Sequence, residues 1–147
     1  MTDSDTNKLT KAESRLPTAI LRKAIISGNE FGWKPKDFIE VVQAANECSM
    51  ALIGGQVQYV FEDGTCELDW LSYDPEQRQP NENWSTYCNR TAKECVDKFN
   101  KLIAATDVEK EALKSFEFLK GKHQSGIDIS SFLAFILYFD DSETDLP

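Results

Sequence analysis

The sequence has little of what metal sites and thiol catalysis need: one histidine and four cysteines. Cys48, Cys66, Cys88 and Cys95 include no Cys-x-x-Cys pair, the spacing typical of structural zinc sites. A Cys–His nucleophile would have to use His123, which lies in a glycine-framed polar segment that indicates a surface turn. We therefore expect no metal and no cofactor, and we interpret the cysteines as buried core residues.

Long apolar runs are also missing. The longest strong one, residues 132–139, is far shorter than the roughly 18 residues that a membrane-spanning helix needs. Residues 1–10 lack the basic start and the apolar stretch of a secretory signal. We therefore expect a cytoplasmic protein that does not enter a membrane and whose cysteines stay reduced.

Basic residues are few. Lys and Arg number 16 against 25 Asp and Glu, which gives a formal net charge of -9. Nucleic-acid binding requires clustered Lys and Arg at the phosphates, so this composition argues against a nucleic-acid partner. It permits a basic protein partner, since opposite charge steers the encounter, but many soluble proteins are acidic for solubility alone.

What remains is the composition of a globular domain. The 147 residues are 41% hydrophobic and 11% aromatic, enough for one real core and too few residues for two ordinary domains. We expect a flexible leader over residues 1–14, a single α+β domain over 15–139 and an acidic tail over 140–147.

Apolar residues at helical spacing predict three helices, over residues 16–27, 35–48 and 83–104. The capping-box spacing from Thr106 to Glu109 predicts a further helix that continues to Leu119. Prolines and polar residues predict a loop over 72–82. Residues 128–139 fit both a helix and a strand, and we favour the helix.

The middle of the chain predicts β structure. The Asp63-Gly64 pair stands between two alternating segments and predicts a hairpin whose turn residues take positive φ. Pairing outward from this turn sets Phe61 against Cys66, Tyr59 against Leu68 and Val57 against Trp70, six side chains that share the expected core face. We predict a small antiparallel sheet over about residues 50–71, packed on one face by N-terminal and C-terminal helices.

The other face of the predicted hairpin is acidic. It carries Glu62, Glu67 and Asp69, and the adjoining loop adds Asp74 and Glu76. A carboxylate pair does acid–base chemistry when one member is desolvated, which an open sheet face does not provide. We interpret these five residues as a binding surface for a basic partner; the alternative is a solvated face without a partner.

Two glycine-containing segments need separate interpretations. Phe31 and Trp33 lie in a glycine-framed loop, where they either pack in the core, which we favour, or anchor a partner. Gly54-Gly55 lacks the following Lys and Ser or Thr of a phosphate loop, so it predicts a tight β connection or bulge.

Three segments carry a resemblance to a known class of proteins: GNEFGW at 28–33, IGGQVQ at 53–58 and DGTCELDW at 63–70. Through them, residues 16–103 resemble the small immunity proteins encoded beside polymorphic or contact-dependent bacterial toxins. The resemblance implies a single-domain cytoplasmic protein that binds and neutralises a cognate toxin domain without catalysis. Many such proteins cover a nuclease's basic cleft with acidic side chains, but the resemblance assigns no particular site residue.

We therefore expect a non-enzymatic immunity protein, monomeric when alone, that binds a basic toxin or effector domain. A secretion chaperone is the alternative, because it too is a small, acidic, cytoplasmic α+β protein. It would bind a client segment as a dimer, and the helix over 83–104 could form the dimer contact. A small enzyme is disfavoured because no recognisable catalytic constellation is present.

Overall fold

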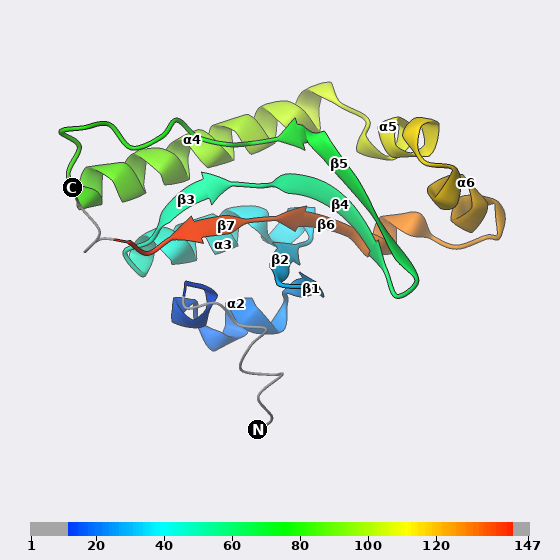
Figure 1. Ribbon diagram of the computed structural model, residues 1–147, viewed down its shortest axis with the longest axis horizontal. Helices are drawn as coiled ribbons and strands as arrows, with labels where there is room; N and C mark the ends of the chain where they lie inside the picture. The colour runs from blue at the N-terminus through cyan, green and yellow to red at the C-terminus, as the bar shows by residue number, and fades with distance from the viewer. Residues whose placement is uncertain (1–11, 143–147) are drawn as a thin grey trace.

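Figure 1 shows a curled antiparallel sheet with two helices, α3 (Phe38–Glu47) and α4 (Trp84–Ala105), behind it; this computed structural model describes residues 12–142. The strands are β1 (Ile25–Ser27), β2 (Glu30–Trp33), β3 (Ala51–Gly54), β4 (Gln56–Phe61), β5 (Gly64–Ser72), β6 (Leu133–Ile136) and β7 (Tyr138–Asp140). Five of them form the main sheet in the order β1-β2-β6-β4-β5, while β3 pairs with β7. The predicted α+β class is confirmed.

Of the remaining helices, α2 (Thr18–Arg22) lies below β1 and β2, and α5 (Val108–Ser115) and α6 (Glu117–Gln124) lie at the right-hand end of the sheet (Figure 1). The 3-10 turns are η1 (Glu13–Arg15), η2 (Pro35–Asp37) and η3 (Ile129–Phe132). Within residues 12–142, no helix is both long and apolar enough to span a membrane.

The core lies between the sheet and helices α3 and α4. Phe38 of α3 stacks on Phe99 of α4 with ring centroids 4.0 Å apart. Both rings meet Phe135 of β6 edge-on, with centroids 6.0 and 5.2 Å away, and all three side chains are buried. Such aromatic contacts add to the apolar area that they bury. The strand alternation therefore directs one face of the sheet into this aromatic cluster.

The helix favoured for residues 128–139 is wrong: after η3, this segment forms β6 and β7. Strand β6 lies between β2 and β4, and its residues Ala134, Phe135 and Ile136 are all buried, as is Leu137. A central strand buried on both sides needs a continuous apolar run, and such a run fits a helix equally well from sequence alone.

The helix predicted over residues 16–27 is too long. Helix α2 ends at Arg22, and residues 25–27 form the edge strand β1, which pairs with β2. The β-branched pair Ile25-Ile26 favours a strand, and the pairing with β2 uses that preference. The sheet therefore extends well beyond the predicted residues 50–71.

The hairpin forms, but its register differs from the predicted one by two residues. The observed pairs are Phe61 with Gly64, Tyr59 with Cys66, and Val57 with Leu68. Glu62 and Asp63 make the turn, and neither they nor Gly64 has positive φ. A Cβ at Gly64 would lie 2.9 Å from the Phe118 ring, so the glycine is needed for packing rather than for turn geometry.

Trp70 is not in the core, contrary to the prediction. Val57 pairs with Leu68 but the preceding Gln56 pairs with Ser72, so residues 69–71 of β5 have no partner on β4. This bulge breaks the two-residue alternation and leaves Trp70 48% exposed. The other five residues of the predicted core face are buried as expected.

Helix α4 and the irregular loop before it agree with the sequence analysis, but the following helix is divided. The single helix predicted from Thr106 is two helices, α5 and α6, separated at Phe116. Asp107, not Thr106, caps α5: the backbone N–H of Lys110 donates to Asp107 Oδ1 at 3.1 Å. His123 lies on α6 rather than in a turn.

The predicted leader and tail lie mostly outside the described residues. At the inner end of the leader, Ala12 and Glu13 are buried. At the other end, β7 continues to Asp140. The folded residues therefore extend past both predicted boundaries.

Candidate functional site

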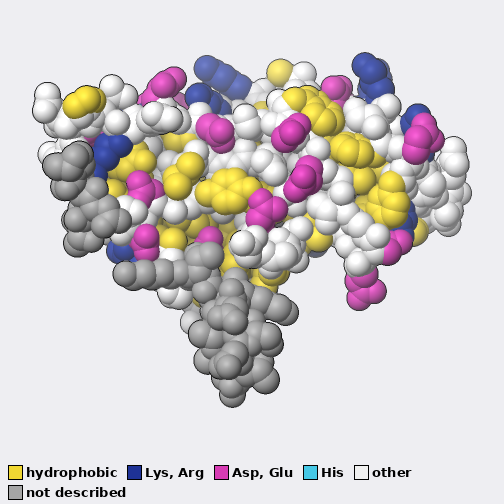
Figure 2. Space-filling view, in the orientation of Figure 1, with side chains coloured by type: hydrophobic (Ala, Val, Ile, Leu, Met, Phe, Trp, Pro, Cys, Tyr) yellow, Lys and Arg dark blue, Asp and Glu magenta, His cyan; other side chains and the backbone are white. Residues whose placement is uncertain are grey.

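The face of the sheet that α3 and α4 leave uncovered is acidic. Figure 2 shows acidic side chains gathered over the middle of this face, around an apolar surface. Strand alternation places Glu30 of β2 here, because its neighbour Phe31 points into the core. The same alternation places Gln58 of β4 and Glu67 of β5 on this face, opposite Tyr59 and Leu68.

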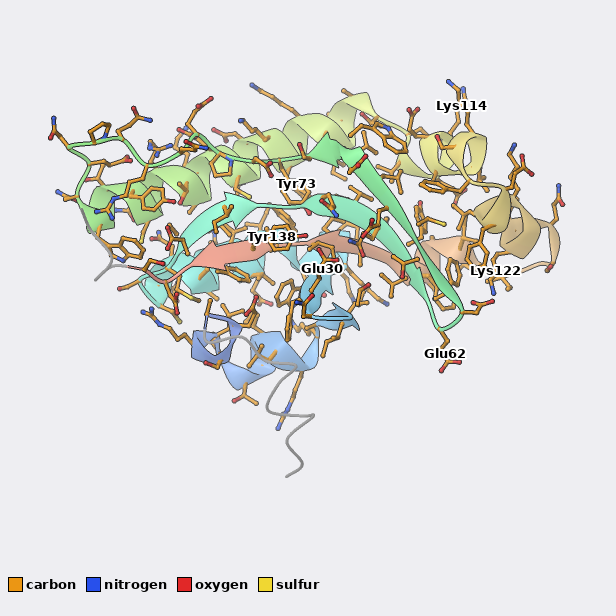
Figure 3. All side chains as sticks on the ribbon, viewed as in Figure 1. Glu30, Glu62, Tyr73, Lys114, Lys122 and Tyr138 are labelled. Carbon is orange, nitrogen blue, oxygen red and sulfur yellow. The ribbon has the colours of Figure 1, made fainter. Side chains whose placement is uncertain are left out.

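A chain of hydrogen bonds crosses this face. The Tyr138 hydroxyl donates to Glu30 Oε2, and Figure 3 shows the two side chains next to each other over the middle of the sheet. Gln58 Nε2 donates to Glu30 Oε1 at 3.1 Å and lies 3.5 Å from Glu67 Oε1. The chain thus connects β7, β2, β4 and β5, and it fixes the position of the Glu30 carboxylate.

Tyr138 faces several negative charges. Burial raises the pKa of the Tyr138 hydroxyl, and the hydrogen bond to Glu30 raises it further, as do the charges of Glu67 and Asp74. The hydroxyl therefore remains protonated and acts as a donor throughout the physiological pH range. Glu30, Glu67 and Asp74 therefore all lie close enough to Tyr138 to affect its pKa.

Asp74 is held in place by the Gly54-Gly55 connection between β3 and β4. The Gly55 N–H donates to Asp74 Oδ1 at 2.9 Å, and a Cβ on Gly54 would lie 2.0 Å from that oxygen. A Cβ on Gly55 would lie 1.8 Å from the Ile136 carbonyl oxygen, so no other residue fits there. The same oxygen accepts a hydrogen bond from the buried Tyr73 hydroxyl at 2.5 Å. Of the two predicted alternatives, Gly54-Gly55 forms the tight connection, between β3 and β4, and the bulge lies one residue earlier at Ile53. The two glycines let the following loop press close to the strands.

No Lys or Arg among residues 12–142 forms an ion pair with the acids of this face, although Lys98 Nζ donates to the Asp74 carbonyl oxygen at 2.5 Å. We call this surface the acidic face, and define it as Glu30, Glu67, Asp69 and Asp74 together with Gln58 and Tyr138. Asp69 is exposed and directly follows the core residue Leu68 on β5, at the start of the unpaired residues 69–71. Every ion pair between described residues lies elsewhere, for example between Lys23 and Glu40 or between Arg90 and Glu82.

Two of the five predicted acidic residues do not join this surface. Glu62 lies in the hairpin turn and projects away from Glu30 and Tyr138 (Figure 3). Glu76 lies in the loop after β5, where its N–H donates to Glu94 Oε1 at 2.9 Å, which ties this part of the loop to α4. Glu67, Asp69 and Asp74 remain as the predicted members.

Phe31 and Trp33 cannot anchor a partner, because both are buried in β2. The Trp33 indole N–H donates to the Ile20 carbonyl oxygen at 2.9 Å, and its ring meets Phe139 edge-on. The structure offers a different exposed aromatic side chain: Trp70, which stacks on Phe116 with centroids 6.1 Å apart. The glycine-framed segment is thus a core strand rather than a presenting loop.

Glu30 and Tyr138 are the members of the acidic face that the sequence analysis missed. Both are polar residues that alternate with buried aromatic ones, Glu30 before Phe31 and Tyr138 before Phe139. That period of two was the available signal.

The described residues include no cluster that could hold a metal ion, and three of the four cysteines are buried. Among residues 12–142, no group of three or more His, Cys, Asp and Glu side chains is arranged to hold a metal ion. All four cysteines are free, and only Cys48 is partly exposed. Burial raises the pKa of the Cys95 thiol to about 12, which keeps it protonated and unreactive.

No family model, curated protein or solved structure matches the chain. The function is therefore inferred from the acidic face itself.

Proposed function

We propose that this chain is a non-catalytic immunity protein that neutralises a basic bacterial toxin or effector domain by binding it with the acidic face. The observation that supports the proposal is the set of four carboxylates on an uncovered sheet face, none of them paired with a base among residues 12–142. Unpaired charges are available to a partner, whereas charges in internal ion pairs are largely compensated.

Long-range electrostatics favours the same partner. The net charge of -9 attracts a basic domain before contact, and a local concentration of acids orients it. The hydrogen bonds from Tyr138 and Gln58 already hold Glu30 in place. Less side-chain freedom is then lost on binding, which lowers the entropic cost of association.

The same geometry favours binding over catalysis. General acid–base chemistry needs a carboxyl held in a site that can enclose its substrate, but Glu67, Asp69 and Asp74 are all exposed. Neutralisation would follow from covering the toxin's basic site. We place this chain in the cytoplasm, as a monomer until its partner binds.

A groove between α3 and α4 favours the secretion chaperone as a second candidate. Its volume is about 310 Å³, and its apolar lining comprises Ile39, Val42, Ala92 and Val96. Ile39 is 37% exposed there. A chaperone would bind an extended client segment at such a groove and would be a dimer, so the mass in solution separates the two candidates.

Co-expression tests the proposed function. The product of the neighbouring reading frame should inhibit growth when expressed alone and should be tolerated when this chain is present. The two proteins should also purify together as a complex of one copy each. A product that is toxic alone and shows neither protection nor a complex would contradict the immunity role.

A further inference from the structure

Gln58 is a fully buried polar residue at the centre of the acidic face. Its Nε2 is directed at two carboxylates, Glu30 at 3.1 Å and Glu67 at 3.5 Å. Its Oε1 is also buried and has no hydrogen-bond partner among the described residues. An unpaired buried amide oxygen destabilises the site in which it lies. The site therefore lacks one hydrogen-bond donor.

The two carboxylates also converge without a cation between them. Glu30 comes from β2 and Glu67 from β5, yet one oxygen of each lies within hydrogen-bond distance of the same Gln58 nitrogen. The separation of these two oxygens cannot exceed the sum of those distances. Like charges this close repel each other in a partly desolvated place, and a cation between them would remove the repulsion.

We propose that Glu30, Gln58 and Glu67 receive one arginine side chain of the basic partner. This inference rests on the proposed function and names the chemistry of its central contact. A guanidinium group is planar and has five N–H donors, so it can donate to both carboxylates and to an amide oxygen at once. A lysine ammonium is a compact point charge without that fork geometry.

Glu30, Gln58 and Glu67 can all accept from such a ligand together. Each ionised carboxylate has about four acceptor sites, so Glu30 and Glu67 can accept from the guanidinium and still accept from Gln58 Nε2. A further guanidinium N–H is then available to Oε1. Tyr138 keeps Glu30 in position through its hydroxyl.

The experiment is a titration of the whole chain with N-acetyl-arginine amide at low salt, followed by nitrogen–proton NMR correlation spectra. We expect saturable shifts of the Gln58 side-chain NH₂ signals, and weaker binding of N-acetyl-lysine amide. Glu67→Gln removes one charged acceptor and should weaken arginine binding by about tenfold, as expected for the loss of a hydrogen bond to a charged group.

Glu62→Gln is the matched control, because it removes the same charge from the same hairpin, in the turn that projects away from the site. It should leave arginine binding unchanged. Both substituted side chains are exposed, and backbone signals at wild-type positions would verify the fold. Unmoved Gln58 signals, equal binding of lysine and arginine, or equal effects of the two substitutions would each overturn the proposal.

The outcome is separable from the immunity role. If co-expression protects cells but the arginine amide leaves the Gln58 signals unmoved, the arginine receptor is wrong and the immunity role stands. If the arginine amide binds at Gln58 but no protection or complex is found, the receptor stands and the immunity role is wrong.

Discussion

The two faces of the main sheet use the same strands but hold their side chains in different ways. On the face covered by α3 and α4, Phe38, Phe99 and Phe135 contact each other through apolar packing. On the acidic face, Tyr138 and Glu30 are joined by a hydrogen bond, and charge remains uncompensated. The covered face therefore carries most of the stability, and the acidic face is free to carry specificity.

The alternation of β2 shows how closely the two faces are connected. Phe31 is buried on the covered side, while the adjacent Glu30 belongs to the acidic face. A substitution on the covered face should therefore reduce stability strongly, and one on the acidic face should affect binding at little cost in stability.

The largest expected effect is on the covered face. Phe135→Ala removes a fully buried ring that contacts Phe38, Tyr73 and Phe99. It should lower the free energy of unfolding by about 3–5 kcal/mol, a large part of a typical total of about 5–15 kcal/mol. Denaturant unfolding measures the loss. A loss no larger than that of an exposed substitution would contradict the assignment of the core.

The second effect depends on pH and concerns the loop that joins β5 to α4. Arg90 Nε donates to Glu82 Oε2 at 2.6 Å, and this contact lowers the pKa of Glu82 from 4.5 to about 2. A lowered pKa means that the ion pair stabilises the fold above the unfolded value of 4.5 and that this contribution is lost as the pH falls toward 2.

Glu82→Gln should accordingly be less stable than the wild type at neutral pH. The difference should shrink steadily as the pH is lowered from 4.5 to about 2. Unfolding curves at a series of pH values give both free energies. A difference that stays constant with pH would mean that the ion pair does not link the loop to α4 as described.

A smaller effect is expected at the edge between the two faces. Trp70 is 48% exposed. Within the described residues, Phe116 is the one aromatic side chain that its indole ring contacts. Trp70→Ala should cost about 1 kcal/mol, the range of a single aromatic pair. Denaturant unfolding of Trp70→Ala and Phe135→Ala under the same conditions compares the two losses in the free energy of unfolding. Equal losses would place Trp70 in the core, as the simple alternation predicts.

Local signals were sufficient to predict part of the fold. Helices α3 and α4 have long apolar stripes and clear ends, and the hairpin has two alternating strands around a turn. Strand β6 could not be predicted, because its continuous apolar run fits helix and strand alike and only its place between β2 and β4 decides. The exposure of Trp70 depends on a bulge that no local pattern marks.

The members of the candidate site that could be predicted are those that lie on or next to the predicted hairpin. Glu67 and Asp69 lie on the hairpin strand that alternates clearly, and Asp74 follows it in the loop. Glu30 and Tyr138 lie on β2 and β7, segments that the sequence analysis interpreted as a loop and a helix. Their meeting requires strands far apart in the chain to lie together, which is a property of the topology.

The most direct test of the central claim is the association rate of this chain with the product of the neighbouring reading frame, which the proposed function expects to be the toxin. Stopped-flow over a range of salt concentrations measures it. The double variant Glu67→Lys, Asp69→Lys should associate about tenfold more slowly or worse at low salt, because electrostatic steering is lost, and its rate should depend less on salt. Its free energy of unfolding should change by no more than about 0.5 kcal/mol.

The matched control is Glu47→Lys, Glu62→Lys, which changes the net charge equally at two exposed acids outside the acidic face. It should slow association far less than the Glu67→Lys, Asp69→Lys variant. If the two double variants slow association equally, overall charge and not the acidic face governs binding. If neither changes the rate, the acidic face does not meet the partner.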